Sequence, residues 1–380
     1  MARRGGASAL IVVLCSVLAL ALQGAAEPLV PAMFVFGDSL VDVGNNNHLA
    51  GCNVVCRANY PRYGIDLPSC HSPTGRFSNG YNLADRLAQR LGFAESPPSF
   101  LSLSWNAGDA TSLARRLSKQ GINFASGGSG LLRTTGQHLC GEVLSMADQV
   151  GNFTSLVQML GSIDRRAAAD LLAKSLIFVS VGSNDLFEYA DRVAANRSAS
   201  RNDTEFLQGL VATYTAYAKD LYAAGAKKFI VVSPSLVGCC PSQRKRARDV
   251  KDVDLSGCRG LPNNLSAQLY PMIDSMLDGL SQELPGIKYS LADSIKMAGN
   301  FITNPGNVTT FDHACCGSGN FGGESVCNST VHLCPDRSRY LFWDWFHPTD
   351  AVSEITANQL FVDNGTFVHP INVHQLVAAP

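Results

Sequence analysis

The 380-residue sequence has a single long hydrophobic run, which lies at its N-terminus. The lack of further runs excludes a protein that crosses a membrane several times. An excess of one charge sign is also missing, since 30 basic residues stand against 31 acidic ones. A net charge of -1 does not attract phosphate backbones, so we expect no nucleic-acid partner. The chain has no internal repeat, low-complexity tract or Pro/Gly/Ser-rich linker, which favours one domain behind the N-terminal segment.

The N-terminal segment has the pattern of a cleaved signal peptide. Arg3 and Arg4 give a positive start, residues 9–22 form a 14-residue apolar stretch, and small residues precede the cleavage point. The stretch is shorter than the roughly 20 residues that a membrane-spanning helix needs, which disfavours an uncleaved anchor. We therefore predict a signal peptide over 1–26 and a single domain over 27–380 without a stable membrane span.

Seven Asn-X-Ser/Thr sequons agree with a secretory route. They lie at Asn152, Asn196, Asn202, Asn264, Asn307, Asn328 and Asn364. One sequon carries little weight, but seven behind a signal sequence favour a secreted glycoprotein, outside the cell or in its wall. Retention inside the secretory pathway stays open.

Eleven of the 12 cysteines lie after the signal segment, and an odd number leaves at least one thiol without an intramolecular partner. Three local groups contain Cys52, Cys56 and Cys70; Cys239, Cys240 and Cys258; and Cys315, Cys316, Cys327 and Cys334. We expect one disulfide from Cys239 or Cys240 to Cys258 and another within the late group, with the complete pairing open. Adjacent Cys-Cys doublets fit zinc poorly, so we expect no metal and no other cofactor.

Short apolar runs, each followed by a small polar or Gly-rich turn and a helical stretch, predict a parallel α/β fold. The expected strands are residues 32–36, 121–125, 175–181, 228–233 and 287–291. Residues 205–223 carry Phe206, Leu210, Tyr214, Tyr217 and Leu221 at spacings of three and four. This pattern and the following Gly225 predict an amphipathic helix. Ligands of parallel sheets bind beyond the carboxyl ends of the strands.

Small polar motifs follow three of these runs. They are Gly37-Asp38-Ser39-Leu40, Ser126-Gly127-Gly128 and Gly182-Ser183-Asn184-Asp185. Near the C-terminus, Asp344 precedes His347 by three residues. Acyl transfer by a hydroxyl needs a nucleophile, a base, a group that orients the base and donors for the oxyanion. These four segments offer a candidate for every role.

Ser39 is the expected nucleophile, because a Gly-Asp-Ser turn exposes its hydroxyl and leaves its N–H available to the oxyanion. His347 is the expected base, and Asp344 is the group that orients it. The Gly127 N–H and the Asn184 side chain are the expected further oxyanion donors. Each motif alone is more often a turn, a helix cap or a surface pair. Their joint occurrence in this order favours catalysis.

The ordered motifs resemble those of GDSL-type esterases/lipases, the SGNH hydrolases, and most closely those of the plant branch. The matching segments are residues 36–40 with Asp42 and 44–46, 123–128, 182–185 and 344–348, together with the further plant signatures at 73–80 and 315–317. The resemblance covers about residues 32–360. It implies a Ser39, Asp344 and His347 triad and an oxyanion hole of Ser39, Gly127 and Asn184. It also implies a flavodoxin-like three-layer α/β/α sandwich with about five parallel strands.

Two features depart from that family pattern. Residues 52–71 contain three cysteines where a shorter, mostly cysteine-free loop is expected, and Asp350 stands where many relatives have Glu. Neither departure touches the triad. The first lies between Ser39 and a family signature, so we expect it to reshape the substrate entrance.

The sequence therefore predicts a secreted carboxylic-ester hydrolase that forms an acyl-enzyme on lipid or other acyl esters, either small molecules or groups bound to a polymer. One alternative is an acetyl esterase of wall polysaccharide, and another is a wall glycoprotein that keeps the fold without catalysis. A disulfide-rich binding module needs far less scaffold. Acyl chain length, alcohol moiety and oligomeric state stay open.

Overall fold

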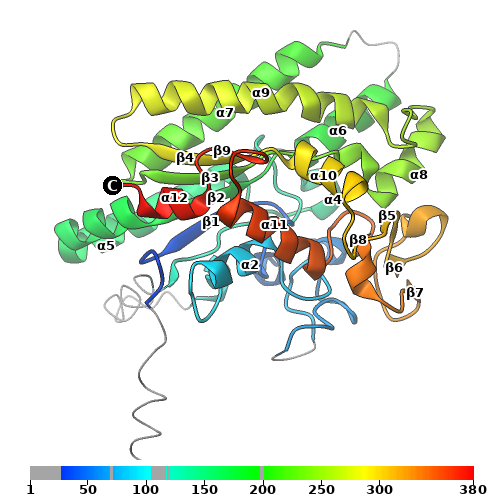
Figure 1. Ribbon diagram of the computed structural model, residues 1–380, viewed down its shortest axis with the longest axis horizontal. Helices are drawn as coiled ribbons and strands as arrows, with labels where there is room; N and C mark the ends of the chain where they lie inside the picture. Colours follow the sequence, from blue (N-terminus) through cyan, green and yellow to red (C-terminus); the bar gives the residue numbers. More distant parts are fainter. Residues whose placement is uncertain (1–26, 69–71, 104–116, 118–119, 197–200) are drawn as a thin grey trace, which may run out of the picture.

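A computed structural model describes residues 27–68, 72–103, 117, 120–196 and 201–380. The predicted signal peptide and Cys70 lie outside these residues. The central sheet has the strand order β1-β2-β3-β4-β9, in which β1 to β4 are parallel and β9 runs antiparallel to β4 (Figure 1). The strands are β1 (Met33–Gly37), β2 (Leu176–Ser180), β3 (Lys228–Val232), β4 (Lys288–Ala292) and β9 (Val368–Pro370).

Four of the five expected strands are confirmed, and the strand expected over 121–125 is wrong. Residues 121–125 run beside β1, where the Phe124 N–H donates to Val35 O at 2.7 Å, but they form only isolated bridges. The Asn123 side chain accepts the Ala125 N–H at 2.9 Å and so competes with a continued strand ladder. The fifth place belongs to β9, at the other edge of the sheet.

The strands are apolar throughout because both faces of the sheet are covered. Successive side chains point to opposite faces, so Phe34 and Ile177 join one core cluster, whereas Met33 and Phe178 join another. The first cluster includes α5 (Met146–Lys174), α6 (Ser183–Ala195), α7 (Asp203–Ala223) and α9 (Gly260–Glu283). The second includes α2 (Leu83–Arg90), α10 (Ser294–Thr303), α11 (Asp350–Val362) and α12 (Val373–Ala378). The fold is therefore an α/β/α sandwich (Figure 1).

Helix α7 confirms the helix expected over 205–223. It begins after Asn202, whose side chain accepts the Glu205 N–H at 3.1 Å. Of the expected apolar face, Leu210, Tyr214 and Leu221 are buried, while Phe206 and Tyr217 are partly buried. Gly225 follows with φ +112°, a conformation that favours glycine and ends the helix.

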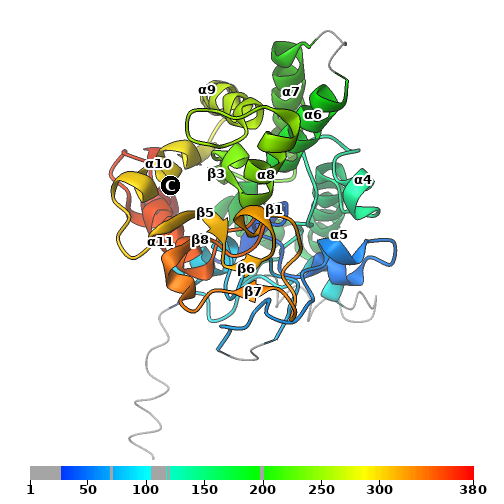
Figure 2. The same ribbon diagram turned by 90° about the vertical axis from the view of Figure 1, so that its right-hand side faces the viewer.

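Short elements gather at one end of the molecule, which faces the viewer in Figure 2. They are α4 (Gln137–Cys140), α8 (Pro241–Val250), β5 (Thr310–Ala314), β6 (Cys316–Gly317), β7 (His332–Leu333) and β8 (Tyr340–Phe342). Strand β5 pairs with β8, and β6 pairs with β7. Strand β8 leads directly into the segment that carries Asp344 and His347.

Among the residues that the structure describes, four disulfides fasten these connections. They join Cys56 to Cys140, Cys239 to Cys258, Cys315 to Cys334 and Cys316 to Cys327. The expected middle and late disulfides are confirmed. The first bridge spans 84 residues and was not expected, because Cys140 lies outside the three local groups. Such disulfides are compatible with a secretory route, and no helix within the described residues is long and apolar enough to span a membrane.

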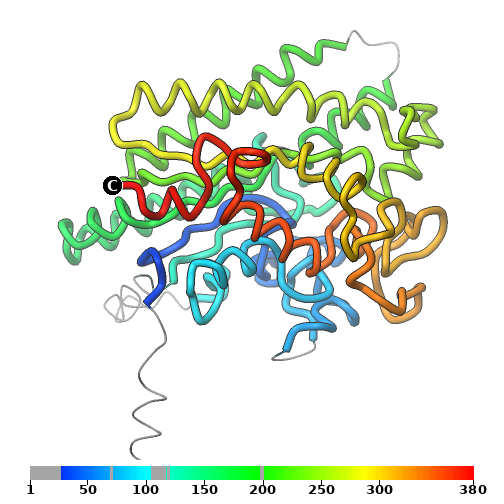
Figure 3. Tube along the Cα trace, in the orientation of Figure 1, coloured from blue at the N-terminus to red at the C-terminus, as the bar shows by residue number. Residues whose placement is uncertain are grey.

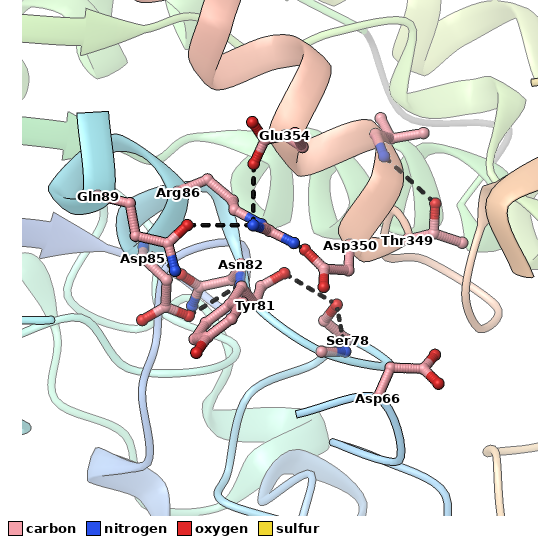
Figure 4. Close-up of polar contacts among 12 residues, drawn as sticks. Asp66, Ser78, Tyr81, Asn82, Asp85, Arg86, Gln89, Thr349, Asp350 and Glu354 are labelled. Carbon is pink, nitrogen blue, oxygen red and sulfur yellow. Dashed lines mark hydrogen bonds and ion pairs between the residues drawn. The ribbon is translucent and has the colours of Figure 1, made fainter. Parts of the chain in front are cut away.

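Helices α2 and α11 are far apart in sequence but lie side by side (Figure 3). Arg86 joins them, with Nε 2.6 Å from Asp350 Oδ1 and Nη1 2.9 Å from Glu354 Oε2 (Figure 4). The backbone N–H of Asp350 donates to Asn79 Oδ1 at 2.9 Å. Because α11 begins three residues after His347, these contacts fix the C-terminal end of the segment that carries the predicted catalytic histidine.

Candidate active site

The turn after β1 and the segment after β8 bring Ser39, His347 and Asp344 together. His347 Nε2 lies 2.7 Å from Ser39 Oγ. On the other side of the ring, Nδ1 lies 2.8 Å from Asp344 Oδ1 and 2.9 Å from Oδ2. The three predicted catalytic side chains therefore form one hydrogen-bonded chain.

A close backbone crossing places Ser39 at the end of β1. Gly37 has φ +146°, and a Cβ atom at this position would lie 2.0 Å from Ser180 O. The Asp38 carbonyl then accepts the N–H groups of Val41 and Asp42, at 3.2 and 3.1 Å. This tight turn leaves Ser39 half-buried at the strand end, with its hydroxyl directed to His347.

The segment that carries His347 is closed on itself. The Trp343 N–H donates to His347 O at 2.7 Å, and the Trp343 side chain is fully buried. Inside this closure, Asp344 Oδ1 accepts the N–H groups of Phe346 and His347, at 2.9 and 2.8 Å. The backbone thus fixes the carboxylate and the imidazole relative to each other.

Asp344 is buried but has a full set of partners. Burial alone would raise the pKa of its carboxyl, but the charge and hydrogen bond of His347, the Tyr63 hydroxyl and the Phe346 N–H hold that pKa below its usual value. The Tyr63 hydroxyl donates to Asp344 Oδ2 at 2.6 Å. Sequence reasoning did not find Tyr63, because no motif marks a lone tyrosine in a long loop.

The predicted oxyanion donors are only partly brought together. Asn184, at the start of α6, lines the same cavity as Ser39, and its Nδ2 donates one hydrogen bond to Ser129 O at 2.9 Å. The Gly127 N–H, however, donates to Asp42 Oδ2 at 2.9 Å, so it is already engaged. This departs from the prediction. The neighbouring Gly128 lines the cavity, with φ +86°. Within the described residues, the N–H groups of Ser39 and Gly128 have no acceptor.

Two other acidic residues of the motifs hold backbone in place. Asp185 accepts the N–H groups of Leu131 and Leu132 and the Thr135 hydroxyl, at 2.8, 3.0 and 2.7 Å. Burial raises the pKa of Asp185 to about 6 and that of Asp42 to about 6, although backbone donors oppose the rise. Asp42 and Asp185 thus hold the backbone at Gly127 and at Leu131 and Leu132.

A cavity of about 880 Å³ opens beside Ser39, Asn184 and His347. Most of its wall is apolar. The apolar side chains include Phe187, Leu236, Val237, Met297, Phe301, Phe311, Leu341, Phe342, Phe346 and Val352. Ligand pockets combine such walls with a few convergent polar groups. The cavity can therefore hold an apolar group against the serine.

An α/β/α sandwich with a serine, a histidine and an aspartate in hydrogen-bond contact beside an apolar cavity fits the class of carboxylic-ester hydrolases. Comparison with known proteins agrees: residues 33–360 match the model of the GDSL-like lipase/acylhydrolase family, and the chain belongs to this family. It is 34% identical over 360 residues to GDSL esterase/lipase 7 of Arabidopsis thaliana, covering 92% of this chain and 93% of the relative. It is also 34% identical to GDSL esterase/lipase At5g55050 of the same plant, covering 92% and 90%.

Proposed function

We propose that the protein cleaves esters through an acyl-enzyme on Ser39. His347 Nε2 takes the hydroxyl proton while Ser39 Oγ attacks the ester carbonyl carbon, and the same proton then passes to the departing alcohol. Water repeats the sequence in the second half, releasing the acid and restoring Ser39. Asp344 orients the ring through Nδ1. The 2.7 Å contact between Ser39 and His347 is the observation that carries this proposal.

The developing oxyanion is stabilised by three donors in this proposal. They are the N–H groups of Ser39 and Gly128 and the second hydrogen of Asn184 Nδ2. Gly128 replaces Gly127 in this role, because the Gly127 N–H is held by Asp42. Losing one such donor lowers kcat by roughly 10² to 10³, so Asn184→Ala should lose activity on that scale. Asn304→Ala, which changes an exposed asparagine outside the cavity lining, should not.

The substrate class that fits the cavity is an ester with a long apolar acyl chain. An acetyl group fills only a small part of a cavity of about 880 Å³. Burying one methylene contributes about 0.8 kcal/mol, so each added carbon should raise kcat/KM by up to about fourfold until the cavity is filled. This argument favours lipid esters over acetylated wall polysaccharide.

The test is a panel assay of the purified mature protein on p-nitrophenyl esters from acetyl to palmitoyl and on acetylated xylan. We expect the rate to rise with chain length and Ser39→Ala to keep less than a few per cent of it with an unchanged circular dichroism spectrum. A preference for acetylated xylan would identify the alternative acetyl esterase. If the folded wild type hydrolyses none of these esters, the remaining alternative is a wall glycoprotein that keeps the fold without catalysis.

We also propose that residues 1–26 direct the chain into the secretory pathway and are then removed, which leaves a single hydrolase domain over 27–380. Five of the seven sequon asparagines are exposed, and Asn152 and Asn328 are half-buried. The secreted protein should migrate above its sequence mass and drop after treatment with peptide-N-glycosidase. A cytosolic pool with intact residues 1–26 and no mobility shift would contradict this route.

A further inference from the structure

The carboxylate of Asp344 has a donor that lies outside the predicted triad. Tyr63 is fully buried, and its hydroxyl donates to Asp344 Oδ2 at 2.6 Å. The two backbone N–H groups that Asp344 accepts both go to Oδ1. Apart from the imidazole, the phenol is therefore the donor that occupies Oδ2 in the described part of the chain.

The loop on the N-terminal side of Tyr63 is held in a conformation that is costly by itself. Arg62 has φ +85°, which is unusual for a residue other than glycine. Its guanidinium donates to Val331 O at 2.6 Å and to Ser329 O at 2.9 Å. These bonds tie the residue next to Tyr63 to the loop closed by the disulfide between Cys315 and Cys334.

A second anchor lies on the other side of Tyr63. Asp66 accepts two hydrogen bonds from Arg337, at 2.6 and 2.7 Å, and one from Asn79 Nδ2 at 2.7 Å. Bidentate bonds of this kind fix direction as well as distance. Tyr63 thus stands between two anchored residues, and its phenol has a defined place.

Aromatic rings surround the phenol and the triad. The Tyr63 ring lies 6.2 Å from Trp343 and 6.3 Å from Phe77, both edge to face. Phe77 in turn packs on the His347 ring at 4.7 Å. In such apolar surroundings a hydrogen bond to a charged group is stronger than in water.

We propose that Tyr63 is a positioning residue for catalysis, which holds the Asp344 carboxylate in the orientation that His347 needs and takes up part of its negative charge. This inference rests on the proposed function. Burial and the charge and hydrogen bond of Asp344 raise the pKa of Tyr63 well above its usual range, so the phenol keeps its proton and remains a donor. The departure seen in residues 52–71 therefore includes a residue that supports the triad, besides any effect on the entrance.

The charge carried by the carboxylate decides the direction of the test. Without the phenol, Asp344 attracts the imidazolium form of His347 more strongly, so the acid limb of the kcat/KM profile moves to higher pH. Other titratable groups near the pair are Asp38, which acts on His347, Cys240, which acts on Asp344, and Tyr60, which acts on Tyr63. These groups are the same in wild type and in the Tyr63→Phe variant. A difference between the pH profiles of these two proteins therefore reports the loss of the Tyr63 hydroxyl.

The experiment compares wild type, Tyr63→Phe and Tyr60→Phe on one medium-chain p-nitrophenyl ester over a range of pH. Tyr60 is the matched control, a half-buried tyrosine 6.3 Å from Tyr63 in the same aromatic group. We expect Tyr63→Phe to lower kcat about tenfold with little change in KM, as for loss of one hydrogen bond to a charged group. Its acid limb should move to higher pH, and Tyr60→Phe should match wild type.

The same substitution in an Asp344→Asn background tells whether Tyr63 acts through Asp344. We expect Tyr63→Phe to have little further effect there, and an undiminished tenfold loss would overturn the proposal. If Tyr63→Phe does not fold, 3,5-difluorotyrosine at position 63 keeps the shape and strengthens the donor. The acid limb should then move to lower pH, and an unchanged profile would refute the role. If the proposed function is wrong, the result is a different one: the Ser39→Ala variant is as active as wild type.

Discussion

Asp344 and Asp38 are both buried near Ser39 and His347, but they differ in the hydrogen-bond donors that their carboxyl groups accept. Asp344 accepts hydrogen bonds from Tyr63, from two backbone N–H groups and from His347. Asp38 accepts the Leu40 N–H at Oδ1, at 3.0 Å, whereas its Oδ2 has no partner among the described residues. Burial therefore raises the pKa of Asp38 to about 7, while that of Asp344 stays below its usual value.

The difference shows that donors, and not depth, decide the charge of a buried carboxyl here. Removing water penalises the charged form at both positions, and only hydrogen bonds or an opposite charge offset that penalty. In the proposed mechanism, Asp344 is thus ionised when His347 takes a proton and becomes positive. Asp38, next to the proposed nucleophile, has fewer hydrogen-bond donors, and burial raises its pKa toward neutral pH.

The largest effect that breaks this contrast is expected from Asp344→Asn. The amide removes the negative charge beside the imidazolium and can impose the wrong ring tautomer, so we expect kcat to fall by about 10³. Because the backbone already closes the segment around His347, the loss should be smaller than for His347→Ala. Single-turnover hydrolysis of a short-chain ester measures both.

Ser39→Ala combined with His347→Ala serves as the control for this ranking. Residues that act as one unit are not additive, so the double variant should be little worse than either single one. Fully additive losses would refute a joint action of Ser39 and His347. An Asp344→Asn variant as inactive as His347→Ala would show that the backbone does not hold the ring.

The next effect concerns stability and comes from Asp38→Asn. The folded pKa of about 7 exceeds the ordinary value of 3.8, so the folded protein binds the extra proton between these values. The contribution of Asp38 to the free energy of unfolding is thus fully present below about pH 4. It is lost as pH rises from 4 through 7, by on the order of 4 kcal/mol. The amide of the Asp38→Asn variant does not titrate, so this variant should lose less stability between pH 5 and pH 8.

Urea denaturation of both proteins at the two pH values measures this difference. An amide nitrogen at the Oδ2 position is equally unpaired at both pH values, so that cost cancels. Asp42 and Asp185, whose pKa values are also raised, are shared by both proteins and cancel as well. Equal pH dependence in wild type and variant would mean that Asp38 is ionised throughout and has a donor.

The sequence was sufficient for features that local patterns encode. Strands β1 to β4 are continuous apolar runs because they are buried on both faces, and helix α7 carries a periodic apolar face. The predicted Ser39, Asp344 and His347 are also in contact in the structure, because strand ends and a short Asp-to-His spacing constrain where side chains can lie.

Features that depend on contacts between distant segments were missed. Strand β9 has three residues and is defined only by its pairing with β4. The bridge from Cys56 to Cys140 and the bond from Tyr63 to Asp344 join residues 84 and 281 positions apart. The choice between Gly127 and Gly128 turns on which N–H Asp42 engages, and adjacent glycines look alike in a sequence.

Asp350 is a third carboxyl, between the two extremes, and its loss should have the smallest effect. It faces Arg86 at 2.6 Å (Figure 4), yet burial outweighs that partner and still raises its pKa. The ion pair therefore yields little net stability, and Arg86 keeps Glu354 at 2.9 Å when Asp350 is neutral. We expect Asp350→Asn to cost about 1 kcal/mol, including a weaker interaction with the N-terminus of α11.

Thermal unfolding followed by circular dichroism measures this, with Glu354→Gln as the matched control on the same arginine. A loss above about 3 kcal/mol would show that Asp350 depends on its donor as Asp344 does. Asp344 and Asp350 would then form one class of buried carboxyl that needs its donors, and Asp38 would form the other.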